Sequence, residues 1–234
     1  MSPLKFHYPY HTPYLNCRNN SEGLSDQPFA APVRLILCRH GLSEGNAAGF
    51  LQGSIDAPLS EDGHKQAERL SLALAGEAFD SAYASDLKRA RETAAAVLRR
   101  HPGLQLREDS RLREICSGDM EGLHFDILEE RYAKELKILR EQMPDFITPG
   151  GESTRDCYER ALDFFTEVLP REAGHTVLLV SHGFLLATVI NYFLGRPYEQ
   201  MVHDIFGNCS ISEVLCRSLT DFDVLRLNDQ SHLV

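Results

Sequence analysis

Two short apolar runs, far apart in the chain, each lead into a His-Gly pair. Residues 33–38 lie just before His40, and residues 176–181 lie directly before His182. Short runs rich in β-branched and aliphatic residues predict buried strands of a parallel sheet. Ligands of open α/β sheets bind at the carboxyl ends of the strands. Either residue alone would be interpreted as an ordinary turn histidine, but together they predict a site at one edge of one sheet.

The rest of the chain alternates helical and strand patterns, which predicts a three-layer αβα fold, a mostly parallel sheet with helices on both faces. Helices are expected over 61–75, 85–100, 124–140, 153–168 and 184–194, with a short one after residue 43. Further strands are expected over 79–84 and 104–107, and residues 211–219 and 223–227 predict a hairpin at one sheet edge. The expected N-cap residues are serines: Ser43, Ser60, Ser85 and Ser153.

Length and composition favour one domain with a sizeable core, because the chain has 234 residues of which 43% are hydrophobic. Residues 1–32 lack periodicity and are expected to be an irregular N-terminal extension, with a transit peptide as the alternative; residues 33–234 would form the domain. No apolar stretch is long enough to span a bilayer. The net charge of −10 argues against nucleic acid or an anionic membrane as the main partner.

Six cysteines are present, and none forms a Cys-x-x-Cys pair. Several of them fall inside predicted strands or helices. This pattern predicts reduced, buried thiols rather than a disulfide framework, and therefore favours a cytoplasmic protein.

The polar residues at the predicted strand ends are those that phosphoryl chemistry needs. The phosphoryl oxygens need positively charged donors, for which the planar arginine fork is suited. The phosphorus needs a nucleophile such as neutral imidazole, and the leaving oxygen needs a proton, which a carboxylic acid can supply. The candidates are Arg39, His40, Asn46, Arg89, Glu114, His182 and the Gly183 amide.

Each of these residues also has an ordinary structural interpretation. Arg89 could be a solvated residue at a helix start, and Glu114 could form a surface pair with Arg113. His182 could be a core histidine bonded to a carbonyl. Gly41 is expected to let a ligand approach the backbone closely.

Eight short segments form a pattern whose order and spacing extend over about residues 33–230, namely 37–46, 52–53, 58–63, 85–94, 112–114, 118–122, 149–153 and 180–183. In these segments the chain resembles the histidine phosphatase superfamily, in its phosphoglycerate-mutase-like branch.

The resemblance implies a role for each matching residue. His40 would be the nucleophile that becomes phosphohistidine, and Glu114 would be the general acid and then the base for water. Arg39, Arg89, Asn46 and His182 would hold the phosphoryl oxygens, with the Gly183 amide as a further donor. Gln52 and Gly53 would belong to the substrate-binding residues. The resemblance implies no metal and no cofactor.

Departures from the mutase pattern favour hydrolysis. Leu42 and Gly45 stand where mutases carry Glu or Gln and Trp, and the segment between residues 122 and 149 lacks their long basic insertion. Residues 149–153 and 227–233 are similar to fructose-2,6-bisphosphatase-like and broad-specificity phosphatases. The expected substrate is thus a small phosphorylated metabolite, a sugar phosphate or bisphosphate.

Several alternatives remain open. The chain could be a phosphoglycerate mutase, a non-catalytic phosphate-binding regulator, or a metallophosphatase that uses His40 and His182 as ligands. A basic group at 134, 137 and 140 could meet a second phosphate, although a solvated helix face is the favoured interpretation. The oligomeric state has no signal in the sequence.

Overall fold

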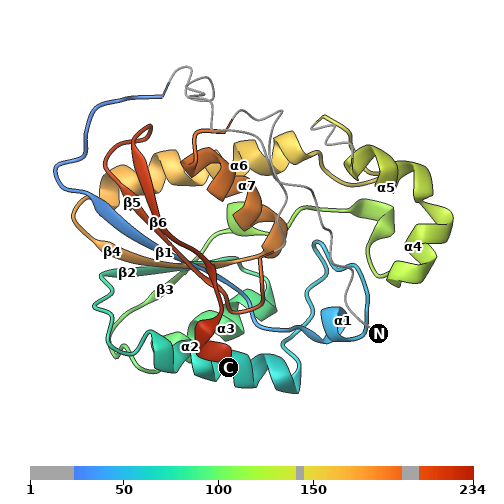
Figure 1. Ribbon diagram of the computed structural model, residues 1–234, viewed down its shortest axis with the longest axis horizontal. Helices are drawn as coiled ribbons and strands as arrows, with labels where there is room; N and C mark the ends of the chain where they lie inside the picture. Colours follow the sequence, from blue (N-terminus) through green and yellow to red (C-terminus); the bar gives the residue numbers. More distant parts are fainter. Residues whose placement is uncertain (1–23, 141–144, 197–205) are drawn as a thin grey trace.

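A six-stranded sheet in the order β3-β2-β4-β1-β5-β6 forms the centre of the computed structural model, which describes residues 24–140, 145–196 and 206–234 (Figure 1). The strands β3, β2, β4 and β1 are parallel, whereas β5 runs antiparallel to β1 and β6 antiparallel to β5. The mostly parallel sheet and its edge hairpin are therefore confirmed. The strands are β1 Val33–Arg39, β2 Ser81–Ala84, β3 Leu106–Glu108, β4 Thr176–Ser181, β5 Ile211–Cys216 and β6 Phe222–Asp229.

Helices cover both faces of the sheet, as the sequence predicted (Figure 1). Alternation along β1 builds two cores, because successive side chains of a strand point to opposite faces. Leu35 and Leu37 pack in the core under α6 and α7, whereas Ile36 and Cys38 pack in the core under α2 and α3. The helices are α1 Glu44–Ala47, α2 Glu61–Ala73, α3 Lys88–Leu98, α4 Phe125–Arg131, α5 Ala133–Arg140, α6 Thr154–Val168 and α7 Gly183–Phe193.

Three of the four expected serine caps are confirmed. The Ser60 hydroxyl accepts from the Gly63 amide at 3.1 Å, Ser153 forms a capping box with Asp156, and Ser43 caps α1. The fourth prediction is wrong, since α3 begins after Leu87 and has no side-chain cap. Ser85 ends up fully buried at the end of β2, where its hydroxyl has another partner described below.

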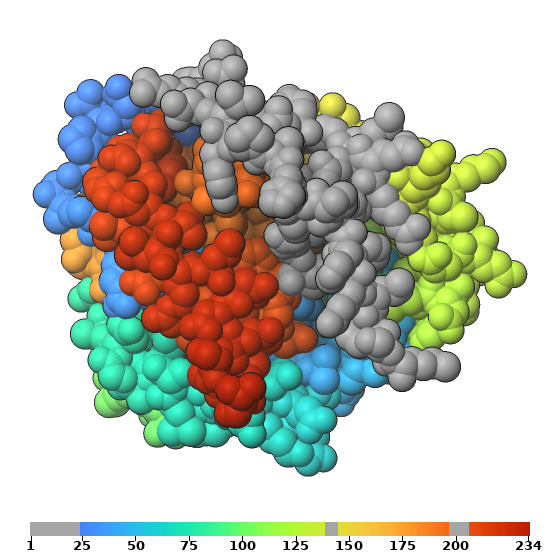
Figure 2. Space-filling model, in the orientation of Figure 1, coloured from blue at the N-terminus to red at the C-terminus, as the bar shows by residue number. Residues whose placement is uncertain are grey.

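The helix predicted over 124–140 is interrupted. Tyr132 has a φ of −122° and ends α4, and α5 then starts at once. The expected apolar stripe does not share one core, because Leu128 is buried while Phe125 is 38% exposed. The two helices extend from one side of the molecule, away from the sheet (Figures 1 and 2). The short strand predicted over 104–107 is shifted to β3.

The described part of the N-terminal extension, residues 24–32, has neither helix nor strand but packs on the domain. Leu24 and Phe29 contact the core, and the Phe29 amide donates to the Arg217 carbonyl at 2.7 Å. Residues 1–23 lie outside the described residues, so the division at residue 32 stays a prediction.

Within the described ranges, no helix is long and apolar enough to cross a membrane. The five cysteines in these ranges are all free thiols, and four of them are buried. The sixth, Cys17, lies outside the described residues.

Candidate active site

The two histidines meet at the carboxyl ends of neighbouring strands. In the parallel register of β1 and β4, Arg39 lies opposite Ser181, and the His40 amide donates to the Ser181 carbonyl at 2.9 Å. The ring centroids of His40 and His182 are 5.1 Å apart, and the two residues are 2% and 0% exposed. Strand pairing thus brings together two residues that are remote in the sequence.

The hydrogen bonding of His40 leaves one ring nitrogen available. Its Nδ1 lies 2.7 Å from the Gly41 carbonyl oxygen, which can only accept. Nδ1 therefore carries the proton, and the lone pair remains on Nε2. Burial lowers the pKa of His40 well below its ordinary value, and the positive charges of Arg39 and Arg89 lower it further. The ring is thus neutral, as a nucleophile must be.

His182 is held by Ser85, the serine that does not cap a helix. Its Nε2 lies 2.8 Å from the Ser85 hydroxyl, while its Nδ1 is buried and has no hydrogen-bond partner among the described residues. Burial lowers the pKa of His182 well below its ordinary value, and the charge of Arg89 adds to the effect. The alternative of a histidine bonded to a core carbonyl is therefore wrong.

Arg89, in the first turn of α3, is buried rather than solvated, with 1% exposure. Its guanidinium donates to the Ile55 carbonyl at 2.7 Å and to the Gly53 carbonyl at 2.8 Å, while its Nε is buried without a partner among the described residues. Gly53 thus positions Arg89 through its carbonyl. A side chain would be strained there, because φ is +50° and a Cβ would lie 2.0 Å from the Glu121 carboxylate.

Arg39 projects over Gly183 at the start of α7. A Cβ on Gly183 would lie 3.2 Å from the Arg39 Nε, so glycine leaves room for the guanidinium. Arg39 donates to the Phe206 carbonyl, and its Nε is buried with no partner among the residues described.

The loop at 206–209 supports Arg39 and His40, although no pattern in the sequence indicates these contacts. The Asn208 side-chain amide donates to the His40 carbonyl at 3.0 Å, and the Cys209 amide donates to the Arg39 carbonyl at 3.1 Å. Cys209 adopts a positive φ of 52°, a conformation that no residue pattern around a cysteine predicts.

Glu114 lies at the N-terminus of α7, within electrostatic range of Arg39 and Arg89. Its carboxylate accepts from the amides of Phe184 at 3.2 Å and Leu185 at 3.1 Å. A helix N-terminus favours such a negative group.

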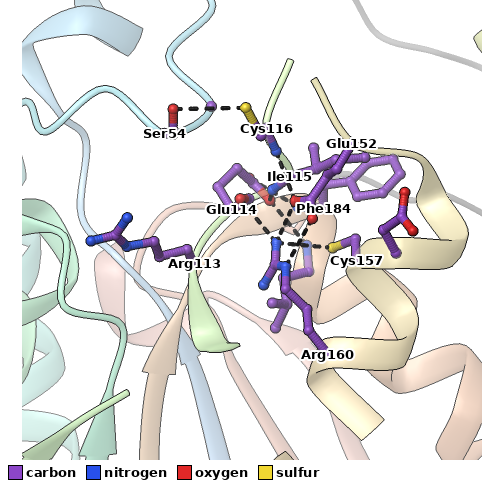
Figure 3. A network of polar contacts seen from close by, with 12 residues as sticks. Ser54, Arg113, Glu114, Ile115, Cys116, Glu152, Cys157, Arg160 and Phe184 are labelled. Atoms are coloured by element: carbon purple, nitrogen blue, oxygen red, sulfur yellow. Dashed lines mark hydrogen bonds and ion pairs between the residues drawn. The ribbon is translucent and has the colours of Figure 1, made fainter. Parts of the chain in front are cut away.

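The surface pair considered for Glu114 and Arg113 is absent. Arg113 instead forms a bidentate pair with Asp86 at 2.7 and 2.6 Å, and Figure 3 shows its side chain directed away from Glu114.

Asn46 and Gln52 are joined through Ser43 in the loop after β1. The Ser43 hydroxyl donates to Asn46 Oδ1 at 2.8 Å, and the Gln52 amide donates to the Ser43 hydroxyl at 2.6 Å. Gln52 is only 6% exposed, so these contacts stabilise the loop.

The role expected of Gly41 needs correction. A Cβ there would lie 2.7 Å from the Gly63 carbonyl, so the absent side chain serves the close packing of the loop after β1 on α2. Its amide donates to the Thr93 hydroxyl at 3.0 Å, which links this loop to α3.

No group of three or more His, Cys, Asp or Glu side chains in the described ranges is placed to hold a metal ion. The basic positions Lys134 and Lys137 are exposed on α5. The Arg140 side chain lies outside the described part of the structure.

The two buried histidines make stability depend on pH. In the unfolded chain both rings take up protons below about pH 6.5, whereas the folded protein keeps them neutral to lower pH. The unfolded state then binds more protons, so the free energy of unfolding should fall with pH below 6.5, by up to about 1.4 kcal/mol per pH unit for each ring. Urea unfolding of the phosphate-free protein between pH 7.5 and 6.0 measures this.

The control for that experiment is the double variant His40→Asn and His182→Asn. Its free energy of unfolding should change less over the same range, since the two titrating groups are gone. An equal pH dependence in both proteins would contradict the explanation.

Comparisons with known proteins agree with this geometry. The model of the histidine phosphatase superfamily (branch 1) matches residues 35–230. Phosphoserine phosphatase 1 of Hydrogenobacter thermophilus is 32% identical over 201 residues, which cover 86% of this chain and 94% of that protein. A phosphoglycerate mutase of Schizosaccharomyces pombe is 34% identical over 181 residues, which cover 74% of this chain and 85% of that protein. A mycobacterial glucosyl-3-phosphoglycerate phosphatase structure superimposes with a TM-score of 0.77 at 27% identity, over 85% of this chain and 100% of that one.

Proposed function

Because the chain belongs to the histidine phosphatase superfamily (branch 1), we propose that it is a phosphomonoesterase in which His40 takes the phosphoryl group from a small phosphorylated metabolite. Residues 33–234 would form the catalytic domain. The family and the relatives of this chain indicate phosphatase or mutase activity. Our proposal is that the reaction is hydrolysis and that the individual residues have the roles given below.

One observation carries the proposal, namely three buried nitrogen atoms without a described partner, on residues that lie near the neutral imidazole of His40. Arg39 Nε, Arg89 Nε and His182 Nδ1 are each buried without a hydrogen-bond partner among the described residues. A buried polar group left unpaired costs about 1–3 kcal/mol. An anion with several peripheral oxygens would give all three a partner, and a phosphoryl group is such an anion.

The reaction would proceed in two steps. His40 Nε2 attacks phosphorus and forms the P–N bond, while the P–O bond to the leaving group breaks and the Glu114 carboxyl gives its proton to the leaving oxygen. The Glu114 carboxylate then takes a proton from water, whose oxygen attacks phosphorus. The P–N bond breaks and phosphate is released. Arg39, Arg89 and His182 would stabilise the charge on the transferring group throughout, with Asn46 and the Gly183 amide as further donors.

Hydrolysis is favoured over mutase chemistry by two features of the chain outside the proposed phosphate-binding residues. A mutase must shield its phosphohistidine from water. The segment between residues 122 and 149 has the short helices α4 and α5 in place of a long basic insertion, and the chain contains no Trp. A mutase remains the second candidate because a phosphoglycerate mutase is 34% identical to this chain.

The substrate class follows from the same comparison. The relatives named as phosphatases act, by their names, on phosphoserine and on glucosyl-3-phosphoglycerate, which are small phosphate monoesters. A sugar phosphate or bisphosphate such as fructose-2,6-bisphosphate belongs to this class. We also propose that the enzyme needs no metal ion and acts in the cytoplasm.

The test is phosphate release from a panel of sugar phosphates, phosphoserine, phosphoglycerates and nucleotides, with and without excess EDTA. We expect free phosphate to be released at a rate that EDTA does not change and that vanadate inhibits. Interconversion of phosphoglycerates without phosphate release would instead establish a mutase. Loss of activity in EDTA that added metal restores would overturn the metal-free mechanism.

Glu114→Gln should slow poor leaving groups more than good ones, because only the poor ones need the proton. We expect kcat to fall about 10²- to 10⁴-fold for an alkyl phosphate and much less for p-nitrophenyl phosphate. Steady-state kinetics on both substrates measure the difference, with the exposed Glu61→Gln on α2 as control. Equal slowing of both substrates would exclude Glu114 as the acid.

A further inference from the structure

A single arginine on α6 binds the segment that carries Glu114. The Arg160 guanidinium donates to the backbone carbonyl of Arg111 at 2.7 Å. It also donates to the backbone carbonyl of Glu114 itself at 3.0 Å (Figure 3). Both acceptors are main-chain atoms, and they lie on either side of Leu112 and Arg113. Arg160 therefore fixes the path of the backbone at the residue that would donate the proton.

Glu152 closes the same network from the other side. Its two carboxylate oxygens accept from Arg160 at 2.7 and 3.1 Å, which is the bidentate geometry that gives an arginine pair its directional specificity. One of those oxygens also accepts from the Cys116 amide at 2.9 Å, and the Glu152 amide donates to the Cys116 carbonyl at 2.9 Å. The segment is thus held both before and after Glu114.

The turn before Glu152 explains why the two backbones can approach so closely. A Cβ on Gly151 would lie 2.5 Å from the Cys116 carbonyl oxygen, and a Cβ on Gly118 would lie 2.1 Å from the Pro149 carbonyl oxygen. The Pro-Gly-Gly-Glu-Ser segment, residues 149–153, thus has a structural role outside the phosphate site. It places Glu152 against the loop that carries Glu114.

The pair is largely withdrawn from water. The side chains of Arg160 and Glu152 are each 21% exposed. Removing one member of a buried pair leaves the other without its counter-charge, so the arrangement depends on both. The Glu114 carboxylate is in turn held by the first amides of α7, and α6 packs against α7.

We propose that Arg160 and Glu152 are positioning residues that fix the Glu114 carboxyl beside the leaving-group oxygen. This inference rests on the proposed function, since it requires Glu114 to be the acid. Neither residue contacts Arg39, His40, Arg89 or His182 through a described hydrogen bond. Their loss should therefore impair proton donation and leave phosphate binding intact.

The experiment compares Arg160→Met, Glu152→Gln, Glu114→Gln and the double variant Arg160→Met with Glu114→Gln. A misplacement of about 1 Å in a catalytic group costs on the order of 10²-fold. We expect Arg160→Met to slow an alkyl phosphate about 10- to 100-fold and p-nitrophenyl phosphate less than about threefold, with an unchanged inhibition constant for inorganic phosphate. Glu152→Gln should show the same pattern with a smaller loss.

The double variant separates positioning from a general structural effect. Once Glu114 is Gln, removing Arg160 should cost less than about a further threefold, because two residues that act as one unit are not additive. Arg34→Met is the matched control. Arg34 is also a partly exposed arginine paired with carboxylates, those of Glu77 and Glu213, but it lies at the start of β1 and makes no described bond to the Glu114 segment.

The outcomes distinguish this inference from the proposed function. Equal slowing of both substrates by Arg160→Met, or full additivity with Glu114→Gln, would overturn the positioning role while the acid role of Glu114 stands. Absence of leaving-group dependence in Glu114→Gln would overturn both. Should Arg160→Met not fold, Glu152→Gln decides the question on the same readout.

Discussion

His40→Ala is expected to abolish turnover, with kcat reduced about 10⁴-fold or more. His40 is the neutral imidazole with a free Nε2 among the positive groups of the site, whereas the free nitrogen of His182, its Nδ1, is proposed to donate to a phosphoryl oxygen. Rapid quenching of the wild-type enzyme during turnover should trap one phosphoryl group on the protein. The variant should trap none.

The control for this prediction is His64→Ala, an exposed histidine on α2. It should retain normal turnover and the phosphoryl intermediate. A His40→Ala enzyme that still hydrolyses phosphate esters at the wild-type rate would refute the covalent mechanism. A phosphorylated residue found elsewhere would refute the assignment of the nucleophile.

Arg89→Met should lower kcat about 10²- to 10³-fold, the usual cost of removing one donor that stabilises transition-state charge. The substitution keeps most of the side-chain volume in a site that is 1% exposed. It should also weaken the stabilisation that inorganic phosphate gives the folded protein, because the stabilisation by a ligand is RT ln(1 + [L]/Kd) and falls as Kd rises. Kinetics and thermal unfolding with and without phosphate measure the two effects.

Two further arginine variants serve as comparisons for Arg89→Met. Arg89→Lys keeps the charge but loses the planar fork that reaches both the Gly53 and Ile55 carbonyls, so intermediate activity is expected. Arg99→Met, at the exposed end of the same helix and paired with Glu68, should be nearly silent. An Arg89→Met enzyme that phosphate stabilises as strongly as the wild type would exclude Arg89 from the phosphate site.

Local patterns in the sequence were enough to predict the sheet edge where the site lies. The runs of β1 and β4 are apolar because both faces of a central parallel strand are buried, and a residue that follows such a strand must lie at its carboxyl end. His40 and His182 follow directly from this argument. Arg89 and Glu114 needed the resemblance, because a charged residue near a helix start is most often solvated.

The supporting contacts could not be predicted, because they depend on tertiary neighbours. Ser85 looked like a helix cap, and only the position of β4 shows that its hydroxyl contacts His182 instead. Asn208 and Arg160 reach backbone carbonyls far away in the sequence, and a carbonyl leaves no mark in the residue pattern. Such contacts become visible only when the whole fold is known.

Two further errors of detail also have physical causes. The residues over 124–140 do follow a helical period, but this pattern does not indicate which residues pack on the apolar side chains. The helix is interrupted at Tyr132, because no single core covers both α4 and α5. Gly41 was expected to make room for a ligand. The residue for which Gly41 makes room is Gly63 on α2. The sequence around Gly41 does not indicate that this helix packs so closely against it.

The central place of β1 in the sheet has a consequence for how activity is acquired. Its two neighbours, β4 and β5, both come from the last third of the chain, and so do His182 and Asn208. A nascent chain whose β5 has not yet emerged from the ribosome already contains Arg39 and His40. The edge of β1 that pairs with β5 in the folded protein is then still unpaired. Pairings between such distant segments form late and slowly. The return of phosphate-ester turnover during refolding should therefore mark the final closure of the sheet and lag behind the recovery of helical signal.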